Sequence, residues 1–238
     1  MLTTVGVTGA SGHLGGYLTA YLWERGHIVV PIGRDVPWTD RVDAVIHLAA
    51  PRDWRDEQQI ADVDTFTADI LTWAERIGAR VINTGSWWQY AHGESGALPY
   101  SRMKDRQQAR ATTTLVPFSI YGRGVRSTRG FVPQLVDSLR TGVSLAGASR
   151  EPRDFVHVTD VCAAYRAALR APDGIYEVRT GRTHTPASLA QRFTGTSPDP
   201  WPEHPSCVPV YRFPTVPGWE PRIDVVQHIE QTVGVVRA

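Results

Sequence analysis

The chain has 238 residues, 42% of them hydrophobic and 21% charged, which is ordinary usage for a globular protein with a normal core. A formal net charge of +1 gives no basic surface for nucleic acid, and two cysteines are too few for a disulfide framework. The sequence contains neither a basic leader followed by an apolar segment nor an apolar stretch near the roughly 18 residues of a membrane-spanning helix. These features predict a cytoplasmic protein that binds neither nucleic acid nor a membrane.

Short strand-like and helix-like segments alternate over the first two-thirds of the chain. We expect strands at residues 3–9, 27–33, 43–50, 80–86 and 113–122, and helices at 13–26, 61–79 and 99–111. A further helix is expected at 131–142, then a strand and a helix within 154–170. Strands separated by helices in this way predict an α/β fold with a Rossmann-type, doubly wound parallel sheet.

The C-terminal part of the chain differs from the rest. Proline is frequent between residues 196 and 221, which predicts irregular loops and edge strands, and a last helix is expected at 224–236. We interpret this region as part of a small, partly discontinuous C-terminal substrate lobe. The expected division is a sheet domain of residues 1–125 and 153–178 and a lobe of residues 126–152 and 179–238.

A glycine-rich loop follows the first expected strand. Its sequence, TGASGHLG, has Gly9, Gly12 and Gly15 in the pattern G-x-x-G-x-x-G and opens a helix. Glycine allows positive φ and a close approach of backbone to a pyrophosphate, and the helix N-terminus attracts that anion. This strand–turn–helix context predicts a dinucleotide site. The other residues assigned to the loop site are Ser11, His13 and Leu14, with His13 expected near solvent.

The second expected strand bears on the choice of dinucleotide. It ends in PIGRD, so Arg34 follows where a cation holds the extra phosphate of NADP. Asp35 stands beside it, and a carboxylate there would hold the ribose of NAD instead. The sequence therefore favours NADP and leaves NAD open, as it leaves open a solvated Arg34 with no such role.

The single lysine of the chain marks a third feature. The chain has 24 arginines and one lysine, Lys104, which lies four residues after Tyr100 and on the same face of an expected helix. Ser86 lies at the end of the preceding strand, where parallel sheets present chemistry. A nearby ammonium is expected to lower the pKa of a tyrosine, and a serine hydroxyl can orient a reacting oxygen. These three residues predict a proton-transfer site for a carbonyl/alcohol pair.

Taken together, the motifs resemble the NAD-dependent epimerase/dehydratase family of extended short-chain dehydrogenases/reductases. They are TGASGHLG, DAVIHLAA, INTGS, YSRMK, PFSIYGRG, RDFVHVTDV and GWEPRIDV, and they recur in family order. The resemblance implies a catalytic triad of Ser86, Tyr100 and Lys104, with Lys104 also holding the cofactor. It implies a cofactor lining of Leu48, Ala49, Ala50, Pro117 and Ser119, and it leads us to expect that Arg153 faces the phosphates of a sugar nucleotide.

Departures from the family pattern limit the choice of reaction. Few residues separate Arg34 from Asp43, so the usual second helix, third strand and acidic adenine contact are expected to be missing. Ser119 replaces the asparagine of many relatives. Trp87 and Trp88 follow Ser86 where a 4,6-dehydratase needs a carboxylate pair, which argues against dehydration. Cys162 lies in an apolar helix and is expected in the core.

The run NTGSWWQY resembles enzymes that make deoxysugars from CDP- or dTDP-4-keto-6-deoxyhexoses. The residues assigned to the substrate are Trp88, Gln89, Ser119, Arg123, Arg153 and His157, although the two tryptophans could instead pack under a short loop. The leading hypothesis is an NADPH-dependent reductase of a nucleotide-linked 4-keto sugar. The alternatives are an NAD-dependent sugar-nucleotide epimerase and a non-enzymatic dinucleotide sensor. Since relatives often form homodimers, a homodimer is possible here as well. His47, in a buried strand, is expected to be a hydrogen-bonded core residue. No spacing of His, Cys, Asp and Glu indicates a metal site.

Overall fold

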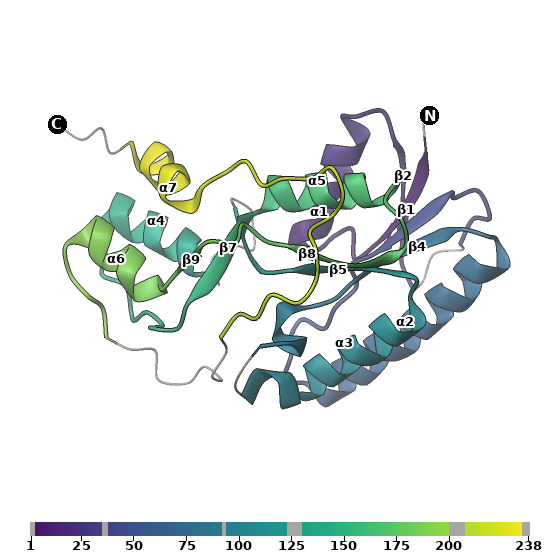
Figure 1. Ribbon diagram of the computed structural model, residues 1–238, viewed down its shortest axis with the longest axis horizontal. Coiled ribbons are helices and arrows are strands. Elements are labelled where there is room, and N and C mark those ends of the chain that lie inside the picture. The colour runs from purple at the N-terminus through teal and green to yellow at the C-terminus, as the bar shows by residue number, and fades with distance from the viewer. Residues whose placement is uncertain (1–2, 35–37, 92–93, 123–129, 200–207, 235–238) are drawn as a thin grey trace.

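The computed structural model describes residues 3–34, 38–91, 94–122, 130–199 and 208–234. Its centre is a parallel sheet of six strands in the order β2-β1-β3-β4-β5-β8 (Figure 1). The strands are β1 (Thr4–Thr8), β2 (Ile28–Ile32), β3 (Ala44–His47), β4 (Arg80–Thr84), β5 (Thr113–Pro117) and β8 (Gly174–Val178). This sheet confirms the predicted doubly wound α/β fold.

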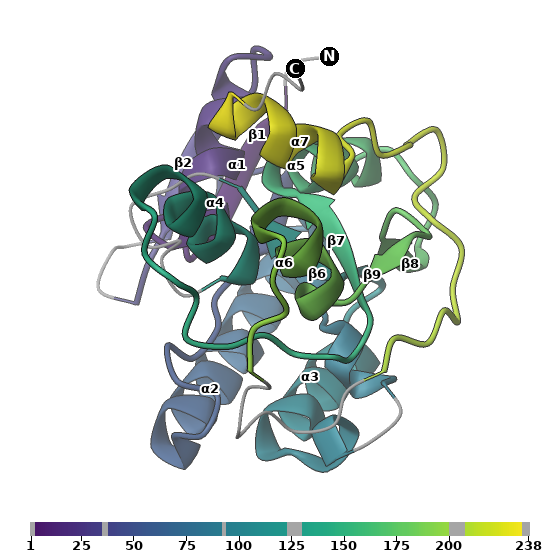
Figure 2. The ribbon, with the colours of Figure 1, turned by 90° about the vertical axis from the view of Figure 1, so that its left-hand side faces the viewer.

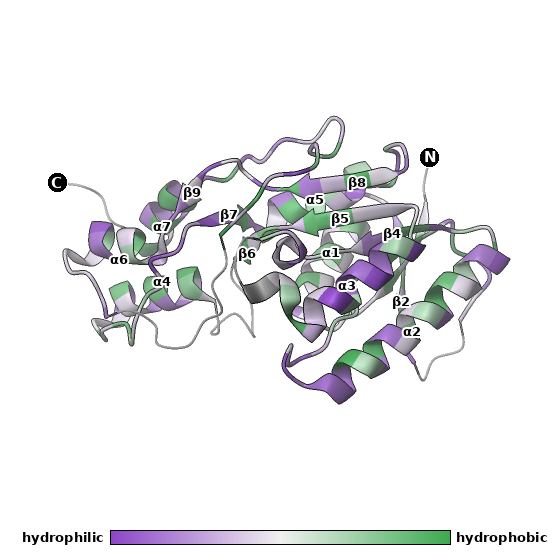
Figure 3. Cartoon of the chain, turned by 60° about the horizontal axis from the view of Figure 1, so that its bottom comes forward, coloured by the Kyte–Doolittle hydropathy of each residue, from purple (hydrophilic) through white to green (hydrophobic). Residues whose placement is uncertain are grey.

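Helices cover both faces of the sheet. α1 (His13–Trp23) and α5 (Val158–Ala168) pack together on one face, and α2 (Glu57–Arg76) and α3 (Pro99–Arg110) lie together on the other (Figure 1). Alternation along each strand explains this arrangement, because successive side chains point to opposite faces. Val7, Ile46 and Ile82 belong to the core cluster beneath α1 and α5, and Val45 and Val81 to the one beneath α2. Strongly hydrophilic residues run along α3 (Figure 3).

A second, smaller unit extends from one end of the sheet. β6 (Ser119–Tyr121), β7 (Arg153–His157) and β9 (Thr183–His184) form a three-stranded sheet. α4 (Phe131–Thr141), α6 (Pro186–Thr194) and α7 (Val225–Val233) pack beside it and share its apolar core (Figure 2). The boundaries predicted for the domain and the lobe stay a prediction, but β7 pairs with strands of this smaller sheet rather than with the main one.

Three sequence expectations need correction. Residues 113–122 are two strands rather than one, because the chain leaves the main sheet at Phe118 and β6 pairs with β7. α2 begins at Glu57 rather than 61, since the Asp56 carboxylate accepts a hydrogen bond from the backbone N–H of Gln59 and caps the helix. α7 begins one residue later than expected and ends at Val233, with Asp224 as its cap.

The short connection between β2 and β3 leaves β2 at the edge of the sheet. Among the described residues no strand lies outside it, as the short spacing predicted. Trp38 occupies this connection, donating from Nε1 to the carbonyl of Gly33 at 2.8 Å and packing against Phe66 and Trp73. Pro31 in β2 suits an edge strand, since proline has no N–H to give a neighbour. No helix in the described part of the chain is long and apolar enough to cross a membrane.

Candidate active site

The glycine loop forms the tight turn between β1 and α1 that the motif predicts. Gly9 has φ +65°, and a Cβ on it would lie 3.1 Å from the backbone N of Ala49. A Cβ on Gly15 would lie 2.1 Å from the carbonyl oxygen of Gly9, so only glycine fits there. Among the described residues no side chain caps α1, and its first turn carries no acid. The free N–H groups of this helix N-terminus suit an anion such as a pyrophosphate.

Arg34 lies just beyond the end of β2. Its guanidinium is 5.6 Å from the centre of the Phe66 ring, and one nitrogen is 3.9 Å from a carboxylate oxygen of Asp62. The side chain is half exposed, so this pair is a weak one. Arg34 therefore lies beyond the paired ends of β1 and β2, directed toward α2 and half exposed, whereas Asp35 lies outside the described residues.

Ser86 begins a short 3-10 helix, η1 (Trp87–Gln89), directly after β4. Its hydroxyl accepts a hydrogen bond from Trp88 N at 3.4 Å, and Ser86 N donates to Oε1 of Gln89 at 2.7 Å. The amide nitrogen of Gln89 donates to Asp105 on α3 at 2.9 Å. This reciprocal cap fixes the serine on a turn that is itself tied to the helix carrying Tyr100 and Lys104.

Tyr100 and Lys104 share one face of α3, as their spacing predicted. The Tyr100 hydroxyl is hydrogen-bonded to the side chain of Ser86, and the Lys104 ammonium lies 5.9 Å from the centre of the tyrosine ring. Lys104 is fully buried and donates to the carbonyl of Thr84 at 2.9 Å and to Oε1 of Gln107 at 3.1 Å. The three side chains thus form one hydrogen-bonded and cationic group.

The pKa of Tyr100 is raised overall, and not lowered as the sequence led us to expect. Burial raises the pKa of Tyr100 to about 12, and the hydrogen bond from Ser86 lowers it only in part. Burial also lowers the pKa of Lys104 to about 8, although the carboxylate of Asp64 raises it. The physical reason is that desolvation penalises any charged form, and the ammonium is aimed at Thr84 and Gln107 rather than at the phenol oxygen.

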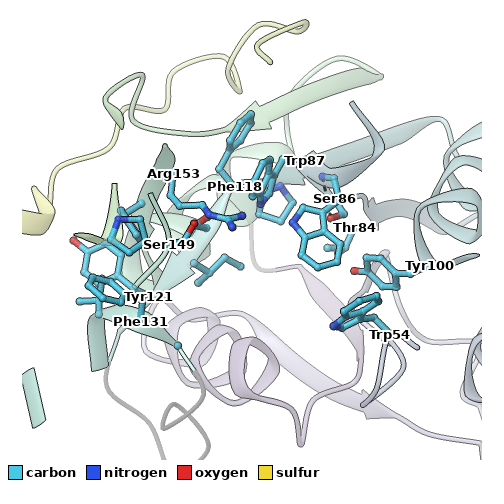
Figure 4. Close-up of a pocket in the computed structure, with 18 of the residues that line it drawn as sticks. Trp54, Thr84, Ser86, Trp87, Tyr100, Phe118, Tyr121, Phe131, Ser149 and Arg153 are labelled. Atoms are coloured by element: carbon cyan, nitrogen blue, oxygen red, sulfur yellow. Dashed lines mark hydrogen bonds between the residues drawn. The ribbon is translucent and has the colours of Figure 1, made fainter. Parts of the chain in front are cut away.

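A cavity of about 500 Å³ opens beside these residues, between the carboxyl ends of the main-sheet strands and the smaller unit (Figure 4). Ser86 and Tyr100 lie on one side of it, with Tyr121, Phe131 and Ser149 on the opposite side. A cavity of this size and position is where open α/β sheets bind their ligands.

Aromatic rings form much of the wall near Tyr100. Trp88 meets the Trp54 ring edge-on at 5.4 Å and the Tyr100 ring at 6.2 Å. Trp87 is instead buried and stacks on Phe118 at 5.9 Å. Both tryptophans line the cavity, Trp87 as a buried ring packed on Phe118 and Trp88 as a partly exposed ring beside Tyr100.

Arg153 provides the cationic part of the cavity. It comes from β7, and its side chain is only 9% exposed. Its guanidinium lies 5.3 Å from the Trp87 ring and 3.8 Å from a carboxylate oxygen of Glu151. Figure 4 shows this group pointing into the space between the Ser86–Tyr100 side and the Tyr121 side. A partly desolvated arginine on a ring is a strong partner for an anionic ligand.

Residues 5–180 match the model of the NAD dependent epimerase/dehydratase family. The chain belongs to this family. The match spans β1 to β8, including the glycine loop and the Ser86, Tyr100 and Lys104 group. It confirms the family that the motifs indicated, and with it an enzyme of the extended short-chain dehydrogenase/reductase class. Sequence comparison with curated proteins finds no match.

Solved structures of similar fold agree with the family assignment. WbmG of Bordetella bronchiseptica, bound to NAD and UDP, has a TM-score of 0.79 and 18% identity over 98% of this chain and 94% of that one. UDP-glucose 4-epimerase of Thermotoga maritima, with UDP-glucose, has a TM-score of 0.78 and 20% identity over 97% of each chain. RMD of Pseudomonas aeruginosa, with NADPH, has a TM-score of 0.74 and 20% identity over 98% and 97%. At this identity the likeness establishes the fold.

Within this family fold, most of the predicted site residues come together. Pro117, Ser119, Trp88 and Arg153 line the cavity with Ser86 and Tyr100. Leu48 and Ala49 follow β3, where their N–H groups bond to Thr8 beside the glycine loop, and the more exposed Ala50 comes next. In the loop itself Ser11 is exposed, while His13 and Leu14 are partly buried, with His13 against Tyr17.

Two predicted substrate residues are used elsewhere. Both ends of the Gln89 amide are engaged by Ser86 and Asp105. His157 precedes α5, where its Nδ1 accepts from Thr159 N, and its ring contacts Tyr121 and His228. Neither belongs to the cavity wall, and Arg123 lies outside the described residues.

Several wall residues were not predicted. Trp54 and Arg52 follow β3, so the rule that ligands lie beyond the carboxyl ends of parallel strands could have found them. Phe131 and Ser149 reach the cavity from the smaller unit. Their positions depend on how that unit packs against the sheet, and no local sequence signal reports such packing.

Proposed function

We propose that this protein is an NADPH-dependent reductase of a nucleotide-linked 4-keto deoxysugar. The observation that carries the proposal is the Tyr100 hydroxyl, hydrogen-bonded to Ser86 at the wall of a cavity that Arg153 also enters. Because the pKa of Tyr100 is about 12, the phenol keeps its proton at neutral pH and is ready to give it to a ketone.

The residues around the β1–α1 turn fit a nicotinamide dinucleotide. A side chain on Gly9 or Gly15 would press against neighbouring backbone, so glycine keeps this turn tight, and the backbone N–H groups at the helix N-terminus suit a pyrophosphate. Arg34 favours NADP through its reach to a ribose phosphate, although bound NAD in similar structures leaves NAD as the other choice. When bound, the dinucleotide supplies hydride for reduction of a carbonyl.

The protein's own side chains carry out the proton transfer. Ser86 donates a hydrogen bond to the carbonyl oxygen and holds it near Tyr100, and Tyr100 gives its proton to that oxygen as negative charge develops on it. Lys104 keeps a positive charge within 5.9 Å of the ring, which stabilises the phenolate left behind. The ketone becomes an alcohol, and the phenolate regains its proton from solvent.

The far side of the cavity supports a nucleotide-linked substrate. Arg153 can pair with phosphate oxygens, and the aromatic rings of Trp88, Tyr121 and Phe131 can pack on a sugar or base. Trp87 and Trp88, not a carboxylate pair, directly follow Ser86, which argues against dehydration.

Oxidation of NADPH with CDP- or dTDP-4-keto-6-deoxyhexose tests this function, with NADH in a parallel assay. We expect Tyr100→Phe to lower kcat/KM by about 10²- to 10⁴-fold, the usual share of general acid–base catalysis. Tyr90→Phe is the matched control, since Tyr90 bonds to Gln108 outside the cavity. Full activity of Tyr100→Phe would falsify the proposed mechanism.

An NAD-dependent sugar-nucleotide epimerase is the second candidate, favoured by the similarity to a UDP-glucose 4-epimerase. An epimerase returns its cofactor to the starting state in each cycle and so retains it. Protein purified without added cofactor and then denatured would release stoichiometric NAD in that case. Cofactor-free protein that binds NADPH reversibly supports the reductase, and binding without turnover over a wide substrate panel would support a sensor.

A further inference from the structure

A buried row of polar side chains crosses the centre of the main sheet beneath α2 and α3. The strand registers pair Thr8 with His47, His47 with Asn83, and Asn83 with Thr114, and all four side chains point to the same face. Thr67 and Gln107 lie over this row from α2 and α3, and both are buried. Buried polar groups are costly unless hydrogen-bonded, so their partners are informative.

The donor and the acceptor of each hydrogen bond around Thr8 and His47 are fixed by the other partners of these side chains. Thr8 Oγ1 accepts from the N–H groups of Leu48 at 3.0 Å and Ala49 at 3.2 Å, so its own proton goes to His47 Nδ1 at 2.9 Å. The ring proton of neutral His47 is then on Nε2, which donates to Thr67 Oγ1 at 2.9 Å. Burial, together with the charge of Lys104, lowers the pKa of His47 to about 3 and keeps the ring neutral.

The same reasoning fixes the orientation of the side-chain amide of Gln107. The Thr67 hydroxyl donates to the carbonyl of Val63 at 2.7 Å, so toward Gln107 it can only accept. Gln107 Nε2 donates to it at 2.9 Å, which turns Oε1 toward the Lys104 ammonium at 3.1 Å. A flipped amide would set acceptor against acceptor at Thr67 and donor against donor at Lys104.

We propose that Gln107, oriented by Thr67 and His47, is a positioning residue that holds the Lys104 ammonium at the end of a hydrogen-bond chain starting beside the glycine loop. The inference rests on the proposed function, in which Lys104 is the cation beside the proton donor Tyr100. The chain joins three segments assigned to the cofactor, namely the β1–α1 turn, residues 48–49 and Lys104.

Other charged or titratable groups also face Lys104. Asp64 on α2 raises its pKa, the neutral ring of His47 lies on β3, and Tyr100 lies one turn earlier on α3. Among the described residues, Thr84 and Gln107 supply the acceptors for two of the three ammonium N–H bonds. Removing the Gln107 oxygen should disfavour the charged form, and a carboxylate in its place should favour it.

The single lysine makes this directly measurable. Protein grown with ε-¹³C-lysine has one labelled side chain, so a pH titration by NMR reports Lys104 alone. We expect Gln107→Met to lower the pKa of Lys104 by about one pH unit, the size of a lost hydrogen bond to a charged group, and Gln107→Glu to raise it. Gln58→Met, the same change at an exposed site of α2, should leave it unaltered.

The two Gln107 variants also separate this inference from the proposed function. If Gln107→Met lowers the pKa of Lys104 and Gln107→Glu raises it, the positioning role is supported even if no keto-sugar is reduced, since the titration needs no substrate. An unchanged pKa in either folded variant overturns it, whether or not Tyr100 proves catalytic. In an active enzyme, the alkaline limb of the kcat/KM pH profile should move in the same direction as the measured pKa, which a merely structural role would not produce.

Discussion

Lys104 illustrates at the scale of one residue how burial decides the working form of a side chain. An exposed lysine keeps its ammonium far above neutral pH, but burial lowers the pKa of Lys104 to about 8. Tyr100 moves in the other direction, to about 12, for the same reason. The protonated phenol and the ammonium therefore coexist at neutral pH, and it is the ammonium that is lost first as the pH rises.

This order of titration predicts an alkaline limb set by Lys104. In the reductive direction, kcat/KM should be constant near neutral pH and fall as the pH rises through about 8, because the cation that stabilises the Tyr100 phenolate is lost. Initial rates of NADPH oxidation between about pH 6 and about pH 10 provide the measurement. A kcat/KM that stays constant up to about pH 10 would contradict the role of Lys104.

At the scale of elements, the C-terminal segment of residues 208–223, here called the strap, is held to the body by buried carboxylates. Glu177 accepts from the N–H groups of Arg212 and Phe213, and Asp154 accepts from the Tyr211 hydroxyl. Asp160 accepts from the N–H groups of Arg222 and Ile223. Proline-rich sequence makes no regular ladder, so carboxylates from α5 and β8 accept from its backbone N–H groups instead, while the one from β7 holds a side chain.

Removing one of these carboxylates should loosen the strap. We expect Asp160→Ala to lower the free energy of unfolding by about 1–3 kcal/mol, since two partly buried N–H groups lose their acceptor at 3.0 and 2.9 Å. Asp160→Asn is the matched control, because its amide oxygen can take the place of Oδ2 and should retain most of the stability. Urea unfolding measures both. Equal stability of the Ala variant and the wild type would mean that the strap is held by Trp219 and other apolar contacts alone.

At the scale of the whole molecule, the polar row makes folding sensitive to acid. His47 binds a proton near pH 6.5 when unfolded but only near pH 3 when folded, chiefly because of burial. The unfolded state therefore takes up more protons over this interval. The contribution is fully present above about pH 6.5 and is lost as the pH falls toward 3, reaching about 4–5 kcal/mol in total. His157 acts in the same direction, since burial and His228 lower its pKa to about 4.

Acid destabilisation should thus begin well above the titration range of ordinary carboxylates. Between about pH 7 and about pH 5 we expect protonation of His47 alone to lower the free energy of unfolding by about 2 kcal/mol, with the less buried His157 adding a further decrease. His47→Gln should remove the His47 part of the decrease and leave the His157 part. Urea unfolding at each pH is the measurement. If the variant and the wild type lose stability in parallel, His47 is not the group responsible.

Local sequence determined much of this protein. Gly9 and Gly15 need backbone conformations or close contacts that other residues cannot adopt, and the four-residue spacing of Tyr100 and Lys104 sets their common face on any helix. Short, largely apolar runs in β1, β3 and β4 likewise indicated a parallel sheet buried on both faces. These signals are short-ranged, so they can be read before the chain is folded.

Tertiary structure alone decided the rest. The exit of the chain from the main sheet at Phe118, the approach of Phe131 and Ser149 to the cavity, and the engagement of Gln89 by Asp105 all depend on contacts between distant segments. The pKa of Tyr100 depends on them too, because burial, which outweighs the hydrogen bond to Ser86, exists only once α3 has packed against the sheet. Spacing places two groups side by side, but desolvation and hydrogen-bond direction, which decide their charge, are properties of the folded interior.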